Sequence, residues 1–271
     1  MKLIEQFICG KKNNPATCED MIVITDGFAA VIDGATSKSC PVIAGLSGGR
    51  FAAEVAAKAI ASFAADINGR DAVAHMTSAL RTATSAHMDM SVEAEKPACS
   101  IAIYSAAKRE IWRVGDIGIL LDGAAHMSPK PMDDIAAHAR AIMIEALLAE
   151  GATLQDLQND DKGRAFIFPM LQRQHLFANR TDRGVFGYGV MNGDDIPAPY
   201  VEIMDVKHVR EIVLASDGYP VLHPAWAQTE DALQRILRDD PMLYKMHPST
   251  KGMQAGQVSF DDRSYIRFTA E

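Results

Sequence analysis

Carboxylates adjoin apolar segments at three places that lie far apart in the sequence. The run 28–32 ends in Asp33 and the run 211–216 ends in Asp217, and a glycine follows each acid. A third acid, Asp261, comes just before the last apolar run. Carboxylate oxygens are the ligands that hard divalent cations prefer, and a pair of such cations can stabilise the transfer of a phosphoryl group. If the runs are strands of one stiff scaffold, these acids could hold two divalent metal ions.

A predicted β-hairpin brings two further acids to Asp33. The dipeptide Asp26-Gly27 separates the apolar runs 21–24 and 28–32. Asp-Gly between two apolar runs is a strong hairpin signal. Because the two strands are antiparallel, Glu19 and Asp20, which precede the first strand, should lie at the same end of the hairpin as Asp33.

The order of the remaining elements favours an α+β fold. Helical spacing of apolar residues predicts helices over 51–66, 71–90, 133–150, most of 153–178 and 226–238. Apolar runs between turn residues predict strands over 2–9, 99–105, 110–116, 117–121, 184–190, 200–206 and 264–268. The three strands between 99 and 121 should form an antiparallel meander. This order suits an antiparallel sandwich flanked by helices, and without repeats or a linker we expect one domain over residues 1–271.

The composition limits the class of protein. The chain has 271 residues, of which 48% are hydrophobic and 23% charged, enough for a sizeable core. Its net charge of -8 argues against nucleic-acid binding, which needs a basic face. No apolar run reaches about 18 residues and the N-terminus lacks a signal-peptide pattern, so we expect no membrane association and a cytoplasmic location. Cys9, Cys18, Cys40 and Cys99 form no C-x-x-C pair, so we expect free thiols.

Two other interpretations of the glycine-containing motifs are weaker. The cluster at 45–50 lacks the Gly-Lys-Ser/Thr ending of a phosphate loop and a strand directly before it, so we interpret it as the flexible start of a close-packed helix. An enzyme of the haloacid dehalogenase type would need a D-x-D motif, but the residue two positions after Asp33 is Ala35.

The motifs together resemble those of the metal-dependent type 2C protein phosphatases. Five segments occur in the order of that family: Glu19-Asp20, Val-Ile-Asp-Gly at 31–34, Arg-Val-Gly-Asp at 113–116, Leu-Ala-Ser-Asp-Gly at 214–218 and Asp261-Asp262. Each motif alone is weak, since a single Asp-Gly is usually only a turn. Five in order across nearly the whole chain are specific.

This resemblance implies a four-layer α-β-β-α sandwich of two mainly antiparallel sheets, with two Mn²⁺ or Mg²⁺ ions at one end. Asp33 would bridge both ions, and the carbonyl of Gly34 would bind one of them. Asp217 and Asp261 would hold the other ion. Asp116 could help to bind a third.

The function implied by the resemblance is that of a serine/threonine phosphoprotein phosphatase, which hydrolyses phosphate monoesters with a metal-activated water. Asp20 and Asp33 would be the catalytic residues, with Asp20 and Glu19 acting through metal-bound waters. The expected partner is a protein carrying phosphoserine or phosphothreonine, and no nucleic acid or membrane is expected.

Several residues depart from the family pattern. The arginine that binds substrate phosphate in the family is replaced by Pro15, and only Lys11 and Lys12 lie nearby as candidates. Ala35 stands where eukaryotic members have a histidine, and Tyr219 follows the Ser-Asp-Gly motif where those members continue to a further aspartate. An alternative function therefore stays open, that of a catalytically weak or inactive phosphatase-fold protein that binds a partner as a regulatory module.

The segment 153–195 matches none of the motifs and could select the substrate. It contains four arginines that could contact phosphate in place of the missing one: Arg164, Arg173, Arg180 and Arg183. An arginine can bind phosphate with two hydrogen bonds, whereas Lys11 or Lys12 would act as a point charge.

Overall fold

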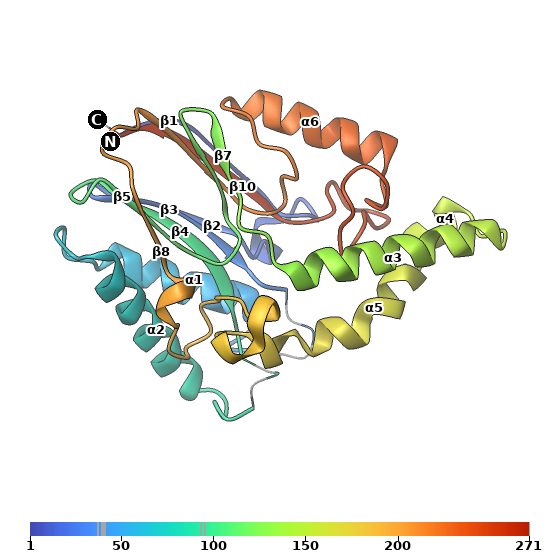
Figure 1. Ribbon diagram of the computed structural model, residues 1–271, viewed down its shortest axis with the longest axis horizontal. Helices are drawn as coiled ribbons and strands as arrows, with labels where there is room; N and C mark the ends of the chain where they lie inside the picture. The colour runs from blue at the N-terminus through green and yellow to red at the C-terminus, as the bar shows by residue number, and fades with distance from the viewer. Residues whose placement is uncertain (37, 39–41, 93, 95, 271) are drawn as a thin grey trace.

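Two antiparallel β-sheets packed face to face form the centre of the molecule. The structure is a computed structural model that describes residues 1–36, 38, 42–92, 94 and 96–270, so Cys40 lies outside the described residues. Helices cover the outer faces of the sheets (Figure 1). The predicted α+β class and the α-β-β-α sandwich are confirmed. Cys9, Cys18 and Cys99 are free, as predicted.

Each sheet has five strands, and every neighbouring pair is antiparallel. The first sheet contains, in spatial order, β2 (Met21–Ile24), β3 (Phe28–Gly34), β4 (Cys99–Ser105), β5 (Glu110–Val114) and β8 (Glu202–Asp205). The second contains β1 (Lys2–Cys9), β10 (Arg263–Thr269), β9 (Glu211–Ala215), β6 (Gly118–Leu121) and β7 (Ala124–His126). The strand predicted over 2–9 is therefore an edge strand of the second sheet.

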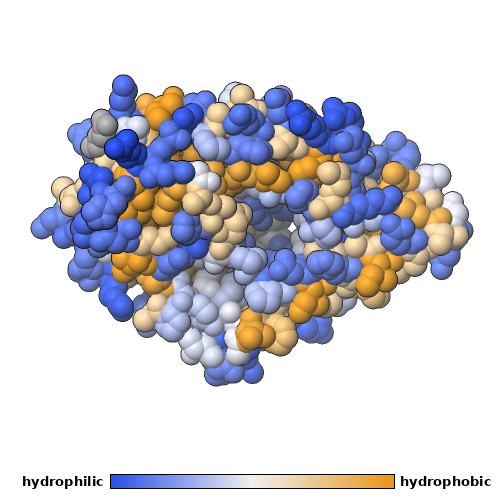
Figure 2. Space-filling view, turned by 45° about the horizontal axis from the view of Figure 1, so that its top comes forward, coloured by the Kyte–Doolittle hydropathy of each residue, from blue (hydrophilic) through white to orange (hydrophobic). Residues whose placement is uncertain are grey.

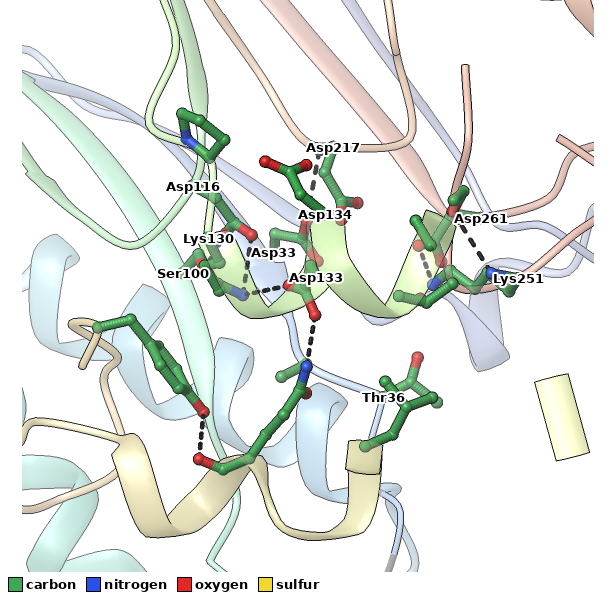
Figure 3. A pocket seen from close by; sticks show the side chains of 18 of the residues that line it. Asp33, Thr36, Ser100, Asp116, Lys130, Asp133, Asp134, Asp217, Lys251 and Asp261 are labelled. Carbon is green, nitrogen blue, oxygen red and sulfur yellow. Dashed lines mark hydrogen bonds and ion pairs between the residues drawn. The ribbon is translucent and has the colours of Figure 1, made fainter. Parts of the chain in front are cut away.

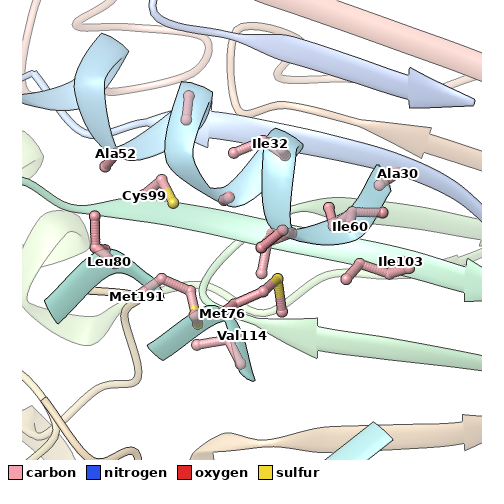
Figure 4. Close-up of a cluster of buried hydrophobic side chains, with 14 of the residues drawn as sticks. Ala30, Ile32, Ala52, Ile60, Met76, Leu80, Cys99, Ile103, Val114 and Met191 are labelled. Atoms are coloured by element: carbon pink, nitrogen blue, oxygen red, sulfur yellow. The ribbon is translucent and has the colours of Figure 1, made fainter. Parts of the chain in front are cut away.

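Three apolar interiors separate the four layers. Helices α1 (Gly48–Ala61) and α2 (Gly69–Ser85) pack on the first sheet over a core that includes Ile32, Met76 and Ile103 (Figure 4). The interior between the two sheets includes Val31, Tyr104, Ile119, Leu214 and Phe268. Helix α6 (Trp226–Asp239) covers the second sheet, and its Leu233 and Ile236 belong to the same core as Tyr265 of β10. Burying one such large side chain stabilises the fold by about 1.5–3 kcal/mol, so these interiors fix the strand ends rigidly.

Three helices form an arm that extends away from the sandwich (Figure 1). They are α3 (Pro131–Ala149), α4 (Leu154–Asn159) and α5 (Lys162–Gln172). Short 3-10 helices cover Pro15–Thr17, Gln174–Phe177, Thr181–Phe186 and Ala198–Tyr200. None of the helices among the described residues is long and apolar enough to span a membrane.

Two predictions of local structure are wrong. The predicted meander ends after β5, because Gly115 has a φ of 94° and turns the chain so that β6 joins the other sheet beside β9. The predicted strand over 184–190 is absent: a 3-10 helix covers Thr181–Phe186, and Gly184 has a φ of 58°. The remaining predicted helices and strands are present, with ends shifted by a few residues. The segment 153–178 is mostly helical, as predicted, but it breaks between α4 and α5, and Pro169, near which an interruption is expected, lies inside α5.

Candidate active site

The predicted hairpin places three acids at one end of the sandwich. In the pairing of β2 with β3, Met21 lies opposite Ile32, so Asp20 lies next to the end of β3 that carries Asp33. The prediction that Glu19 and Asp20 return to the same end of the hairpin as Asp33 is therefore confirmed. The chain termini lie at the opposite end of the sandwich (Figure 1).

A cavity of about 560 Å³ lies at this end. Four of its lining carboxylates come from separate strand ends, namely Asp33 from β3, Asp116 after β5, Asp217 after β9 and Asp261 before β10 (Figure 3). Figure 2 shows a hollow near the middle of the viewed face, bordered mainly by hydrophilic residues. With Gly34, which also lines the cavity, the structure thus brings together five of the predicted site residues, while Glu19 and Asp20 lie buried beside them.

Glycines allow the close packing that positions the acids. A Cβ atom on Gly34 would lie 2.6 Å from the carbonyl oxygen of Glu19, and one on Gly49 would lie 2.7 Å from the carbonyl carbon of Gly34. Helix α1 therefore begins directly against the end of β3, in agreement with its interpretation as a close-packed helix. A Cβ atom on Gly218 would clash with the carbonyl oxygen of Asp262, so the turn after Asp217 is equally tight.

Asp33 and Asp217 are neighbours at the floor of the cavity. The backbone N–H of Asp217 donates a hydrogen bond to Oδ2 of Asp33 at 3.5 Å. Desolvation raises the pKa values of both carboxyl groups well above the ordinary value of an aspartate. Repulsion from neighbouring acids, Asp261 among them, raises both pKa values further. A bound cation would remove this repulsion and favour the ionised carboxylates.

Asp20 is fully buried and one of its oxygens has no partner. Ser216 Oγ donates a 2.6 Å hydrogen bond to Oδ2, but Oδ1 accepts no hydrogen bond from the described part of the chain. Burial raises the pKa of Asp20 to about 8, against the opposing effect of the Ser216 hydroxyl. A buried carboxylate oxygen without a donor is costly, and a cation or a cation-bound water would satisfy it.

Glu19 has two hydroxyl partners that the sequence did not reveal. Thr36 Oγ1 donates to Oε2 and Ser47 Oγ donates to Oε1, each at 2.6 Å. Ser47 is also the N-cap of α1, so Glu19 lies at the positive end of a helix dipole. Asp262 accepts hydrogen bonds from the backbone N–H groups of Lys11 at 2.7 Å and Glu19 at 3.0 Å. These contacts connect the segment before β2 to the segment before β10.

Two lysines bind the outer acids of the cavity. Lys251 Nζ pairs with Oδ2 of Asp261, and Lys130 Nζ lies 2.8 Å from Oδ2 of Asp116. Burial alone would raise the pKa of each carboxyl group. The charge of Lys251 nevertheless holds the pKa of Asp261 below its ordinary value, and the charge of Lys130 does the same for the pKa of Asp116. Ser100 Oγ also donates to Asp116, at 2.5 Å. Sequence reasoning missed both lysines, because neither belongs to a motif or a periodic segment.

The residues proposed for phosphate binding have different surroundings. Lys11 Nζ lies 3.2 Å from Asp262, 3.4 Å from Asp261 and 3.6 Å from Glu19, so it is part of the acid cluster. Lys12 is exposed and does not line the cavity. Phosphate binding by either lysine stays a prediction.

In the segment 153–195, Arg164 lies close enough to the cavity acids Asp261 and Asp133 for their charges to raise the pKa of its guanidinium, against the larger lowering effect of burial. Its guanidinium donates to the carbonyl oxygen of Thr250 at 2.6 Å. The other three arginines bind groups within their own segment: Arg173 the carbonyl oxygen of Pro169, and both Arg180 and Arg183 the carboxylate of Asp182.

The donors at the floor of the cavity suit a hard divalent cation in their chemistry. Asp33 and Asp217 offer carboxylate oxygens, Gly34 offers a carbonyl, and Asp20 has an oxygen without a partner. Among the residues that the structure describes, no three acid, histidine or cysteine side chains are already grouped as one ligand set. Binding would therefore require a rearrangement of side chains, and an ion held by Asp261 would have to displace Lys251.

Comparisons with known proteins identify the fold. No protein-family model matches the sequence, and no curated protein is significantly similar to it. Solved structures of phosphatases match over almost the full chain. A bacterial serine phosphatase is 12% identical with a TM-score of 0.51, covering 98% of this chain and 97% of that one. Serine/threonine phosphatase Stp1 from Staphylococcus aureus is 12% identical with a TM-score of 0.51, covering 100% and 96%.

The catalytic domain of the serine/threonine protein phosphatase PstP in complex with two manganese ions is 15% identical, with a TM-score of 0.46 and coverage of 98% and 97%. The fold assignment rests on the two structures with the higher TM-scores. This chain therefore has the fold of the bacterial serine/threonine phosphatases, as its resemblance to the type 2C family implies.

Proposed function

We propose that this chain is a divalent-metal-dependent phosphatase that hydrolyses phosphoserine or phosphothreonine in proteins. One observation carries the proposal: Asp33, Asp217 and Asp261 reach the floor of one cavity from three separate strand ends, with the buried Asp20 beside them. The shared fold with serine/threonine phosphatases supports the reaction class.

Asp33, Asp217 and the carbonyl of Gly34 would hold the metal. A bound Mn²⁺ or Mg²⁺ supplies an activated water and stabilises charge on the transferred phosphoryl group. Asp20 would orient that water, because Ser216 fixes its Oδ2 and leaves Oδ1 available as an acceptor. Glu19, held by two hydroxyl groups, would keep the hairpin end in place.

Cationic side chains on the cavity wall would attract the phosphate group. Lys38, Lys130 and Lys251 line the cavity, and Lys38 lies close enough to Lys251 for their charges to repel each other. Each lysine would act as a point charge on a phosphate oxygen. Together they could replace the arginine that the family has at the position of Pro15.

The alternative function, a weak or inactive module that binds a partner, also has support in the contacts. Asp261 and Asp116, two of the expected metal ligands, are paired with Lys251 and Lys130. A site whose acids are neutralised by lysines can be stable without performing chemistry. The two functions differ in whether added metal produces turnover.

The test of the proposed function is hydrolysis by the metal-stripped protein with Mn²⁺ or Mg²⁺ added back. The substrates are p-nitrophenyl phosphate, a phosphothreonine peptide and the same peptide with phosphotyrosine. Metal-dependent hydrolysis with preference for the phosphothreonine peptide is expected. A folded protein that binds metal but hydrolyses none of the three would contradict the proposal and favour the partner-binding module.

A further inference from the structure

Both carboxylate oxygens of Asp261 face an ammonium group. Lys251 Nζ pairs with Oδ2, and Lys11 Nζ lies 3.4 Å from Oδ1. The carboxylate is only 9% exposed, so these ion pairs are shielded from water. In the described part of the chain, Asp33 and Asp217 form no comparable ion pair. Two of the ammonium groups among the acids therefore converge on Asp261, and a third, Lys130, pairs with Asp116.

Lys251 reaches this position from a well-anchored segment. Arg140 of α3 is fully buried and donates to the carbonyl oxygens of Met242 and Ser249, at 2.8 and 3.0 Å. A Cβ atom on Gly252 would lie 2.8 Å from Nη2 of Arg140, so the chain passes directly against the guanidinium. These contacts fix the backbone around Lys251, which makes its ion pair part of the fold and not a chance surface contact.

A second divalent ion at Asp261 would meet this fixed positive charge. The ion would have to displace Lys251 from Oδ2 and would still lie near Lys11 Nζ, since both ammonium groups converge on one carboxylate. Repulsion between like charges at such short range opposes binding. The charge of Lys251 also acts on Asp33 and Asp217, but among the described residues no ammonium group lies within ion-pair distance of either carboxylate, so an ion there would displace none.

We propose that Lys251 takes the place of one divalent cation at Asp261, so that the native chain holds a single divalent ion, at Asp33 and Asp217. The proposal rests on the proposed function in one respect: it assumes that a divalent ion binds at Asp33 and Asp217. It does not require the protein to hydrolyse a phosphate ester. Lys130 follows the same pattern at Asp116, where its ammonium lies 2.8 Å from the carboxylate. Lys251 thereby replaces a mobile ion with a charge supplied by the chain itself.

The experiment counts bound Mn²⁺ by electron paramagnetic resonance, which separates isolated ions from exchange-coupled pairs. Wild-type protein is compared with Lys251→Met, which keeps most of the length of the side chain and removes its charge, and with Lys251→Arg, which keeps the charge. Lys96→Met is the matched control, because Lys96 lines the same cavity but pairs with Asp194 at 2.7 Å. Circular dichroism establishes that each variant is folded, and Lys251→Gln replaces the methionine variant if that one does not fold.

The expected result is one Mn²⁺ per chain with the spectrum of an isolated ion in the wild type, in Lys251→Arg and in Lys96→Met. Lys251→Met should bind two ions with an exchange-coupled spectrum. A wild type that binds two coupled ions, or no ion, overturns the proposal, as does a Lys251→Met protein that still binds one. Turnover is measured separately: a wild type with one ion and no hydrolysis supports this inference while refuting the phosphatase function.

Discussion

Ser216 Oγ donates a 2.6 Å hydrogen bond to Oδ2 of Asp20. Asp20 precedes β2 of one sheet, and Ser216 follows β9 of the other. This bond therefore joins the two sheets at the end that carries the site. It also fixes a buried carboxylate that forms no ion pair with any residue the structure describes, so the chemistry of the site depends on the alignment of the sheets.

The stability of the metal-free protein should fall as the pH rises from about 4 to about 8. Burial raises the pKa of Asp20 from 3.8 to about 8, so in this range the folded protein holds a proton that the unfolded chain has released. The free energy of unfolding decreases with pH wherever the folded state binds more protons. Urea denaturation in the presence of a chelator, repeated at several pH values, measures this slope.

Asp20→Asn is the control for that experiment, because an amide does not titrate. Its slope should be shallower, though not zero, since Asp33 and Asp217 have pKa values raised in the same direction. An unchanged slope in the variant would mean that Asp20 is already ionised in the metal-free protein.

Mn²⁺ should stabilise the folded protein, because it binds acids that the unfolded chain does not hold together. At a free concentration of 100 times Kd, the expected gain in unfolding free energy is about 2.7 kcal/mol. Asp33→Asn should lose most of this gain, whereas Asp182→Asn, at an exposed acid paired with Arg180, should keep it. Thermal denaturation with and without the ion distinguishes the variants, and an equal gain in both would exclude Asp33 as a ligand.

Arg140→Ala should destabilise the protein strongly. Arg140 is fully buried, lies 2.7 Å from Asp161 and donates to three backbone carbonyls, so its removal leaves a buried charge unpaired. Breaking such a pair typically costs about 3–5 kcal/mol. Arg180→Ala removes an exposed ion pair with Asp182 and should cost less than about 1 kcal/mol. Similar urea midpoints for the two variants would contradict the anchoring role of Arg140.

Gly49→Ala should destabilise the fold, although alanine is usually favoured over glycine inside a helix by about 1 kcal/mol. The added Cβ atom would lie 2.7 Å from the carbonyl carbon of Gly34 and 2.8 Å from the carbonyl oxygen of Ala35. Backbone atoms cannot move aside without shifting Asp33. Gly27→Ala, where no atom lies within 4 Å of the new Cβ, should change the unfolding free energy by less than about 0.5 kcal/mol. Calorimetry on both variants measures the difference.

The sequence was sufficient to predict the hairpin and the acids at its end, because their signals are local. Asp26-Gly27 sets the turn, and the antiparallel pairing of Met21 with Ile32 then follows. The glycines at 34 and 49 were recognisable, but their mutual contact depends on how α1 packs on the sheet. Gly115 was part of a recognised motif, yet its positive φ, which sends β6 into the other sheet, was not predicted.

The lysines of the cavity could not be predicted from the sequence. Lys251 lies in the segment 239–259, whose sequence is polar and lacks clear periodicity, and its position depends on the contacts of Arg140 with this segment. Lys130 reaches Asp116 only because α3 begins beside the strand ends. Such charge pairs arise from tertiary packing, and no spacing rule relates the partners along the chain.

The central claim is that Asp33 makes metal-dependent phosphoester hydrolysis possible. The most direct measurement is kcat/KM for the phosphothreonine peptide with saturating Mn²⁺, in wild type, Asp33→Asn and Asp182→Asn. A decrease in kcat/KM on the order of 100-fold or more is expected only in Asp33→Asn. A 100-fold decrease corresponds to about 2.7 kcal/mol of lost transition-state stabilisation. Equal rates in wild type and Asp33→Asn, or no hydrolysis by wild type with metal bound, would contradict the claim.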